Sequence, residues 1–430
     1  MKKAVAYTLA PWDHVLAYLR IVAPWERAGI QLIQGNPDGQ INPDKVSDAD
    51  IVLLQRDFPA HIVAYEKITA LARAQAKPVV LDLDDLLLDL PQNHPDRLNH
   101  HYAGRLFPIL RALLEADLVT VSTAQLADVL RPMNPNILVL PNCIDERVWQ
   151  LALREESTPD KSPITIAFMG GDSHIPDFEP LLSVLIEILT AYQGRVIIRS
   201  IGMQLPPSLQ GLKNAEAVSF LFNYPGYVNF VQQQDFDLAI APLQDNLFNR
   251  CKSPIKYLEY SALGIPGVYS SLPPYSSLIR HGENGFLASN SEEWRQAILK
   301  LIEDPHLRWK MGQAAQETVR YDWLLGDHAQ AWLDAYQFAV SRAGSQRQQA
   351  TLPLRLFADL THQNRLWEEE LETLLQEKET ETRQLAQKLI EKEQYIAALS
   401  EQINLRRGFL AKINRGVQRL SARFIAKSDN

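Results

Sequence analysis

The sequence contains few cysteines and no long apolar run. Cys143 and Cys251 are the only cysteines among 430 residues, too few for a disulfide framework, which suits a reducing cytoplasm. No stretch of about twenty apolar residues occurs, so we expect no membrane span. The short apolar run at the start is broken by Pro11, Trp12 and Asp13, so we expect a first strand there instead of a signal peptide.

An excess of positive charge is also missing. The 43 Lys and Arg residues are outnumbered by 51 Asp and Glu residues, and the formal net charge of −8 argues against nucleic acid as a general partner. The apolar content of 46% is ordinary for soluble domains, but 430 residues are too many for one core. Two domains and an appendage are therefore expected.

Residues 1–150 alternate short apolar stretches with helical ones, which predicts parallel βαβ units in a Rossmann-like α/β domain. A helix that carries Arg20 is expected to end near residues 29–33. Residues 151–163 are polar and contain prolines, as interdomain linkers do. The alternation resumes over residues 164–343 as a second Rossmann-like domain. Its expected strands include residues 164–169, 195–202, 218–222, 236–242 and 267–271.

Residues 249–266 combine polar groups, a helix and a sharp stop. Ser253 and Pro254 are expected to cap and begin the helix, and Gly264 and Pro266 to end it.

Lys252, Lys256 and Glu259 are spaced i, i+4 and i+7 and therefore share one face of this helix. Two cations are suited to neutralise a diphosphate, and the carboxylate to accept a ribose hydroxyl, so this face could hold a sugar nucleotide. A solvated helix with a Lys–Glu pair is the alternative.

Five further positions are predicted to face the same donor. Gly170 and Gly171 follow the first strand of the second domain, where glycines let the backbone approach a phosphate. His174 lies in the next loop, with Asp177 as a partner or a helix cap. Arg199 and Asn249 complete the predicted donor-binding set, and an aromatic ring between Tyr224 and Tyr227 either stacks on the base or packs.

Three carboxylates, Asp82, Asp84 and Asp85, are expected at the carboxyl end of a first-domain strand, where parallel sheets bind ligands. They contact the acceptor or act as a base, hold a divalent metal, or cap the loop. His94 follows them closely and is the candidate catalytic histidine.

The run Lys256-Tyr-Leu-Glu259-Tyr-Ser-Ala-Leu-Gly264-Ile-Pro266 resembles the nucleotide-binding segment of retaining glycosyltransferases of the GT-B fold, family 4 class. The resemblance covers roughly residues 1–340. It implies two Rossmann-like domains that face each other across a cleft, a donor held mainly by the second, and contact of Glu259 with the ribose. The family usually has a further Glu eight residues before this one, where the present chain has Cys251. The family's donor-sugar contact therefore has no obvious carrier. Other segments keep the order of the class: Ala116-Asp-Leu-Val-Thr-Val-Ser-Thr123, Leu138-Val-Leu-Pro-Asn142, Glu283-Asn-Gly-Phe-Leu287 and Asp304-Pro-His-Leu-Arg308.

Residues 344–430 have a different composition, rich in Glu, Gln, Lys and Leu. Apolar residues recur with 4,3 spacing, which predicts a coiled coil that makes a homodimer or docks a partner. The last part is basic and amphipathic, and either continues the coiled coil or contacts an anionic membrane surface, where a lipid-linked acceptor would lie. The spaced positions are Leu371, Leu375, Lys378, Thr382, Leu385, Leu389, Lys392, Ile396, Leu399, Ile403, Arg406, Leu410, Ile413, Val417, Leu420 and Phe424.

We therefore expect a retaining hexosyltransferase that moves a sugar from a nucleotide-sugar to a glycan or lipid-linked acceptor in cell-envelope polysaccharide or glycolipid synthesis. Lys256 would serve catalysis by stabilising the departing diphosphate, so no metal or other cofactor is required, although magnesium or manganese could assist. The alternatives are a sugar-nucleotide epimerase, a metal-dependent transferase, and a non-catalytic sugar-nucleotide-binding scaffold that acts through its coiled coil.

Overall fold

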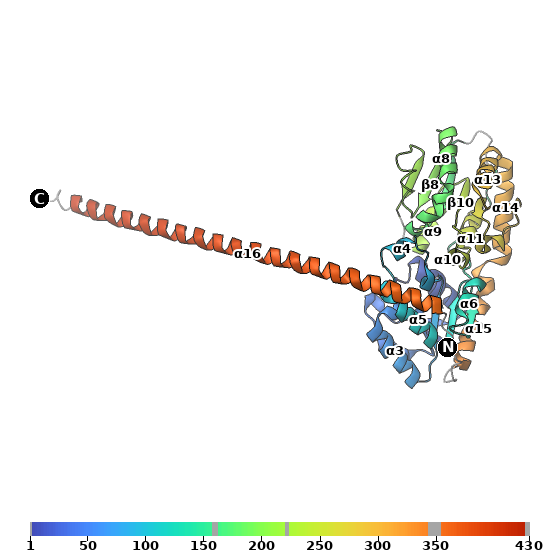
Figure 1. Cartoon of the computed structure of the whole chain (residues 1–430), viewed down its shortest axis with the longest axis horizontal. Helices are drawn as coiled ribbons and strands as arrows, with labels where there is room; N and C mark the ends of the chain where they lie inside the picture. The colour runs from blue at the N-terminus through green and yellow to red at the C-terminus, as the bar shows by residue number, and fades with distance from the viewer. Residues whose placement is uncertain (1, 157–161, 220–222, 343–353, 426–430) are drawn as a thin grey trace. The chain divides into compact units, whose positions relative to one another are not determined.

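The computed structural model describes residues 2–156, 162–219, 223–342 and 354–425. It divides into a compact unit, Met1–Asn364, and a second unit, Arg365–Asn430. The first unit contains two parallel six-stranded sheets, which Figure 1 shows in separate groups of elements. The prediction of two Rossmann-like domains with a helical tail is confirmed.

The first sheet has the strand order β2-β1-β3-β4-β5-β6. All its pairings are parallel, and short apolar sequences explain why most of its strands are buried on both faces. Its strands are β1 (Lys3–Tyr7), β2 (Gln31–Gln34), β3 (Ile51–Gln55), β4 (Val79–Leu83), β5 (Leu118–Val121) and β6 (Ile137–Val139). Its helices include α1 (Val15–Ala17), α2 (Ala23–Arg27), α3 (Ile62–Ala74), α4 (Pro95–Leu98), α5 (Leu106–Glu115) and α6 (Ala124–Leu130).

The expected helix end near residues 29–33 is wrong. The helical segment ends at Arg27, Gly29 takes a positive φ of 74°, and the chain then enters β2. Glycine allows this turn without a steric penalty, which frees the following residues to pair with β1.

The second sheet has the order β12-β11-β10-β7-β8-β9 and is also parallel. Its strands are β7 (Ile164–Met169), β8 (Val196–Ile201), β9 (Ala215–Val218), β10 (Leu238–Ala241), β11 (Gly267–Ser270) and β12 (Phe286–Ala288). The strand predicted at 218–222 begins earlier than expected, and residues 220–222 lie outside the described residues. Its helices include α7 (Ile175–Phe178), α8 (Leu182–Ala191), α9 (Tyr224–Gln232), α10 (Leu247–Arg250), α11 (Ile255–Ala262), α12 (Pro273–Ser276), α13 (Ser291–Glu303) and α14 (Pro305–Asp322).

Helix α15 (Leu325–Arg342) returns to the first domain. Trp332 and Ala335 of this helix are buried in one hydrophobic cluster with Ile21 and Trp25. This packing fastens the end of the second domain to the outer face of the first sheet.

Helix α16 (Leu354–Ile425) contains the predicted tail. Its first turns belong to the compact unit, because Leu360 is fully buried in the hydrophobic core of the first domain. From Glu368 to Gly408 every side chain is exposed. Within the described ranges, no helix is long and apolar enough to cross a membrane. Three of the spaced tail positions, Ile413, Leu420 and Phe424, lie outside the described side chains, as do Arg419, Arg423 and Lys427 of the basic last part.

Candidate donor and acceptor site

Helix α11 begins one residue later than predicted. Pro254 occupies the N-cap position and makes no side-chain cap, while the Ser253 hydroxyl accepts a hydrogen bond from the Asn142 amide at 3.0 Å. Ser253 therefore joins the two domains and does not cap the helix. The consequence is that the start of α11 is held against the first domain, at the carboxyl ends of both sheets.

Lys256 projects from the first turn of α11 toward His174 and Asp177, and the three side chains form a hydrogen-bonded row, the Lys256 row. The ammonium nitrogen of Lys256 lies 2.9 Å from Nε2 of His174, and Nδ1 of His174 lies 2.8 Å from an oxygen of Asp177. Since the ammonium is a donor, Nε2 accepts and the Nδ1–H donates to Asp177. Burial together with Lys252 and Lys256 lowers the pKa of His174 to about 3, so the imidazole is neutral. The row fixes the direction of the Lys256 side chain and leaves two of its three hydrogens for a ligand.

Gly170 makes room for this lysine. A Cβ atom at Gly170 would lie 3.1 Å from both Cε and Nζ of Lys256 and 3.0 Å from the Phe168 ring, so any side chain there would displace the ammonium group. The Gly170 N–H is engaged by the carbonyl of Ile201 at 2.9 Å. Gly171, by contrast, has open space around its Cα and is the backbone position that a phosphate can approach.

Glu259 lies one turn further along α11 and is buried. Its two oxygens accept one hydrogen bond each, from the hydroxyls of Tyr224 and Tyr227, both at 3.1 Å. Burial raises the pKa of Glu259 to about 7 even though both hydroxyls and Lys256 oppose the shift. A carboxylate in this state can gain or lose its proton near neutral pH.

Lys256 and Glu259 line one cavity of about 150 Å³. Its walls include the ends of β7 and β8 and, from the first domain, Val15 and Leu19. Tyr227 also lines it, whereas Tyr224 is fully buried and unable to stack on a ligand. The cavity thus places a cation, a carboxylate and an aromatic ring together at the interface of the two domains.

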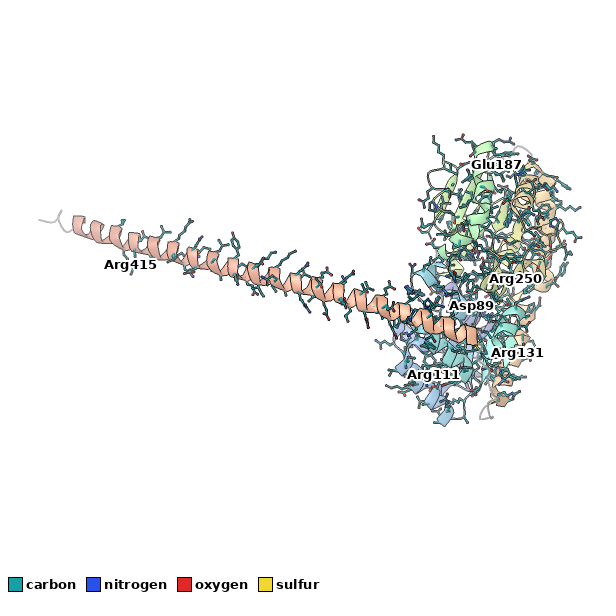
Figure 2. All side chains as sticks on the ribbon, viewed as in Figure 1. Asp89, Arg111, Arg131, Glu187, Arg250 and Arg415 are labelled. Carbon is teal, nitrogen blue, oxygen red and sulfur yellow. The ribbon has the colours of Figure 1, made fainter. Side chains whose placement is uncertain are left out.

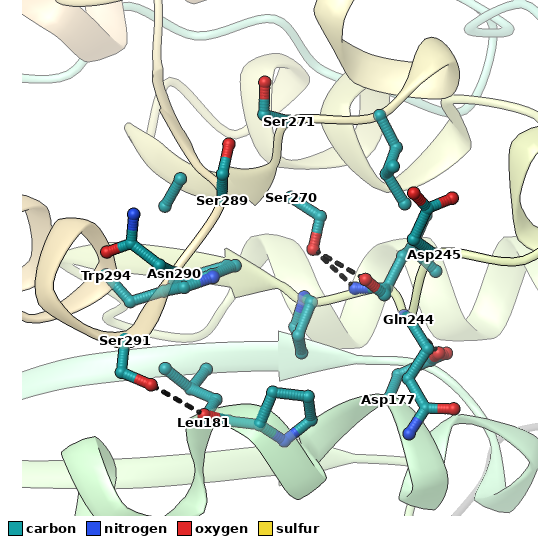
Figure 3. A pocket seen from close by; sticks show the side chains of 15 residues that line it. Asp177, Leu181, Gln244, Asp245, Ser270, Ser271, Ser289, Asn290, Ser291 and Trp294 are labelled. Atoms are coloured by element: carbon teal, nitrogen blue, oxygen red, sulfur yellow. Dashed lines mark hydrogen bonds between the residues drawn. The ribbon is translucent and has the colours of Figure 1, made fainter.

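A larger cavity of about 470 Å³ lies beyond the ends of β10, β11 and β12. Figure 3 shows its serines partly engaged already, with Ser270 bonded to the backbone of Leu243 and Ser291 to that of Pro180. The residues that line it include Asp177 and Asp245 and neither lysine nor arginine. A diphosphate would meet carboxylates there with no lysine or arginine in the lining, so the smaller cavity is better suited to a diphosphate.

Lys252 and His94 approach each other from the two domains. The Lys252 ammonium lies 4.8 Å from the centre of the Phe248 ring, and the His94 ring packs edge-on against the same Phe248 at 5.2 Å. Burial lowers the pKa of His94 despite its carboxylate neighbour Asp96, so this histidine is neutral. Phe248 therefore separates the predicted acceptor side from the second lysine.

The three predicted carboxylates differ in exposure. Asp82 is 3% exposed, and its oxygens accept from Arg20 at 2.8 and 3.2 Å and from Thr120 at 2.8 Å. Both oxygens of Asp82 are engaged inside the domain, so the structure gives this residue a structural role and does not add support to its predicted catalytic one. Asp84 is 12% exposed and Asp85 30%. Asp85 is thus the carboxylate best placed to meet a substrate.

Arg56 neutralises this acidic group and was not identified from the sequence. It forms an ion pair with Asp84 and lies 3.5 Å from Asp85. Burial raises the pKa of Asp85, but Lys252 and Arg56 outweigh it, so the pKa lies below its usual range and the group is ionised. Arg56 directly follows β3, which pairs with β4. Its position at the carboxyl end of a strand next to the one that carries the carboxylates could have identified it as their partner from the sequence.

A metal at these carboxylates would compete with Arg20 and Arg56 for the same oxygens. Among the residues that the structure describes, no group of three or more His, Cys, Asp and Glu is arranged to hold a metal ion. The arginines supply the positive charge at this edge of the first sheet.

Arg199 does not join the predicted donor site. It lies inside β8, its guanidinium binds Glu216 on β9 at 2.9 Å, and it does not line the cavity around Lys256. Asn249 does join the network, because its amide donates to Asp177 at 2.8 Å and so supports the His174–Lys256 row.

Cys251 occupies the position at which the resemblance implies a donor-sugar contact. It is fully buried among first-domain core residues, and its carbonyl accepts from the Thr123 hydroxyl at 2.8 Å. The Cys251 side chain therefore takes part in the packing between the two domains and is closed to solvent.

The first turns of α16 hold the loop that carries His94. Asp359 accepts two hydrogen bonds from Arg97, at 2.7 and 3.2 Å, and Arg97 also donates to the Leu90 carbonyl at 2.8 Å. His94 begins the short helix that contains Arg97. The bidentate Arg97–Asp359 pair thus holds α4, the short helix whose N-cap is His94.

We expect Asp359→Asn to loosen residues 91–102, because the Asn side chain keeps one acceptor but loses the charge that holds Arg97. Hydrogen exchange followed by mass spectrometry should show exchange in this loop at least several-fold faster. Glu369→Gln is the matched control, because its exposed pair with Arg365 lies on the same helix away from the loop. Equal exchange in both variants would show that the pair does not order the loop.

Comparisons with known proteins agree with this architecture. Residues 165–304 match the family described as "Glycosyl transferases group 1". HepE from Anabaena, solved in complex with UDP-glucose, superposes with a TM-score of 0.53 at 15% identity, over 78% of this chain and 99% of HepE. Sucrose-phosphate synthase from Thermosynechococcus elongatus superposes with a TM-score of 0.54 at 12% identity, over 78% of this chain and 98% of the synthase. A glycosyltransferase from Rickettsia africae superposes with a TM-score of 0.51 at 14% identity, over 79% of this chain and 98% of that glycosyltransferase. No curated protein matches by sequence. The compact unit has the GT-B glycosyltransferase fold.

Proposed function

We propose that the protein is a glycosyltransferase of the group 1, family 4 type that moves a hexosyl group from a nucleotide-sugar to a glycan or lipid-linked acceptor, with retention and without an essential metal. The observation that carries the proposal is the placement of Lys256 against Gly170, in one cavity with the buried Glu259. HepE binds UDP-glucose, which makes a UDP-sugar the first donor to test.

Lys256 lines the cavity and would neutralise the diphosphate as it departs, whereas Lys252 does not line the cavity and would add positive charge from one turn away. Bond cleavage leaves negative charge on the phosphate oxygens, and a preorganised ammonium group stabilises that charge more in the transition state than in the bound donor. The neutral His174 holds Lys256 without taking its charge, and Asp177 and Asn249 hold His174. No step then needs a metal.

Glu259 would accept a ribose hydroxyl, with the base against Tyr227 and the apolar wall of the cavity. The acceptor would lie on the first-domain side, near Asp85 and His94. Asp84, which is tied to Arg56, would position Asp85 there.

Incubation with a panel of nucleotide-sugars and glycan or lipid-linked acceptors tests the activity, followed by mass spectrometry and by NMR of the anomeric carbon. A glycosylated product of unchanged anomeric configuration is expected. Conversion of the donor alone would indicate an epimerase, and loss of transfer with a chelator would indicate a metal-dependent enzyme. Donor binding with no turnover would favour a non-catalytic module.

The pKa values of the two cavity residues predict a narrow pH optimum. Glu259 must be ionised to accept a ribose hydroxyl, and its pKa is about 7. Lys256 must be protonated, and burial with the charge of Lys252 lowers its pKa to about 8. The rate at low donor concentration should therefore rise through about pH 7 and fall through about pH 8. A flat profile between pH 6 and 9 would contradict these roles.

A further inference from the structure

The tail exposes large apolar side chains along one seam, which Lys378, Thr382 and Lys392 interrupt. Leu375, Leu385, Leu389, Ile396 and Ile403 are between 51% and 62% exposed, and they recur at the 4,3 spacing of a coiled-coil seam. Figure 2 shows side chains standing off the helix along this stretch, with Arg415 labelled near its end. Long single helices are stabilised mainly by packing of an apolar face, so this row needs a partner.

The two ends of the tail carry opposite charge. The segment 368–381 contains seven Glu residues and one Lys, whereas the segment 406–423 contains six Arg or Lys residues and no acid. Favourable interaction with the helix dipole is confined to the first and last turns and does not explain charge that extends over several turns. Each segment is instead complementary to the other.

A parallel pair in register would bring like charges together. Each acidic segment would face its own copy, as would each basic one, and Lys378, Lys392 and Arg406 lie on the seam itself, where each would meet the same residue of the partner helix. Like charges that meet in an apolar seam destabilise a pair.

An antiparallel pair removes these conflicts. With Ile396 opposite Leu399, the seam places Lys392 opposite Ile403 and Lys378 opposite Val417. Leu389 then faces Arg406. Each charged seam residue meets an apolar one, over which its long stem can pack while its charge reaches water. The acidic segment of one helix runs beside the basic segment of the other.

We propose that the tails of two copies of this chain pair as an antiparallel coiled coil between residues 378 and 417. The apolar row, the charge complementarity of the two segments and the cationic seam positions all select a second copy in this orientation. The inference is independent of the transferase activity. Membrane contact through the basic segment uses the same residues and is the competing outcome.

Engineered cysteines in the full-length protein distinguish these arrangements. Cys143 and Cys251 are both buried, and burial raises the pKa of each thiol to about 12, so the background reactivity is low. Lys378→Cys and Val417→Cys are directly opposite in the antiparallel pair, but are about 60 Å apart along one helix. A mixture of the two variants should form a disulfide-linked dimer under mild oxidation, and neither variant alone should do so.

Arg415→Cys is the matched control, because it lies on the outer face and should not cross-link with Lys378→Cys. Light scattering of the unmodified chain should give the mass of a dimer. Self-cross-linking of either single variant would indicate a parallel pair and overturn the proposal. A monomer at all concentrations would also overturn it, including one whose basic segment binds vesicles containing phosphatidylserine.

Discussion

Replacing Lys256 by methionine is expected to lower turnover by about 100-fold to 1,000-fold, the usual cost of removing one preorganised donor from a developing negative charge. Methionine keeps much of the length and apolar character of the stem beside Phe168, so the packing around Gly170 should survive. The effect on kcat should equal or exceed the effect on donor binding, because the interaction strengthens as the diphosphate departs. Steady-state kinetics with a saturating acceptor measure both quantities.

Lys213→Met is the control for this variant, because Lys213 is an exposed lysine that does not line the cavity. Circular dichroism should match the parent in both variants. The unfolding midpoint should be unchanged in Lys213→Met and raised in Lys256→Met, because burial lowers the pKa of Lys256 to about 8 and the charged ammonium therefore costs the fold stability at neutral pH. Unchanged turnover in the Lys256→Met variant, with a folded protein, would remove the lysine from the mechanism.

Replacing Glu259 by glutamine is expected to weaken donor binding by about 10-fold to 100-fold, the range for loss of a hydrogen bond to a charged group. The same change should stabilise the fold. The pKa of Glu259 is about 7 in the folded state against an ordinary value of 4.5. The folded state therefore holds the proton more tightly, and its stability falls as the pH rises from about 4.5, where the unfolded chain ionises, to about 7, where the folded protein does. Glutamine cannot ionise, so we expect a gain on the order of 1–3 kcal/mol at pH 8 that vanishes below about pH 5.

Titration calorimetry with the nucleoside diphosphate measures the loss of affinity, and urea denaturation at pH 5 and pH 8 measures the gain in stability. Glu187→Gln, on the exposed side of α8, should change neither quantity. A Glu259→Gln variant that is less stable than the parent at pH 8 would show that the ionised carboxylate stabilises the fold. It would contradict the account in which this carboxylate costs stability and serves donor binding.

The sequence predicts the fold well because the strands obey a local rule. Runs such as 51–54 and 166–169 are apolar throughout, as strands covered on both faces must be, and helices separate them. The strand 31–34 was missed because it is only partly buried at the edge of its sheet and carries glutamine at both ends.

The site was predicted in part, and the assignments that the structure does not support have a common origin. Lys256 and Glu259 are neighbours on one helix, so their spacing alone reveals their shared face. The roles predicted for Asp82 and Arg199 gain no support because their partners, Arg20 and Glu216, come from other elements, and only the folded chain shows that the charges are already neutralised. Long-range pairing of this kind leaves no local signal.

Cys251 illustrates the same limit. In the sequence, Cys251 in place of the usual Glu suggests that a contact with the donor sugar is lost. In the structure it is fully buried in the core of the first domain and its backbone binds Thr123, so the substitution contributes to domain packing. Asn249 and Asp177 support Lys256 through His174 and do not line its cavity, so they are not direct replacements for this contact with the donor sugar.

The most direct test of the donor site is a thermal-shift measurement on the purified chain with UDP-, GDP-, ADP- and dTDP-sugars, each with EDTA and with added magnesium or manganese. A ligand at 100 times its dissociation constant stabilises the folded state by about 2.7 kcal/mol, which is readily detected. We predict a rise in the unfolding midpoint with one base, equal in EDTA and in metal, and absent in the Lys256→Met variant under the same conditions. A rise that appears only with metal, or no rise with any nucleotide-sugar, would contradict a lysine-based donor site.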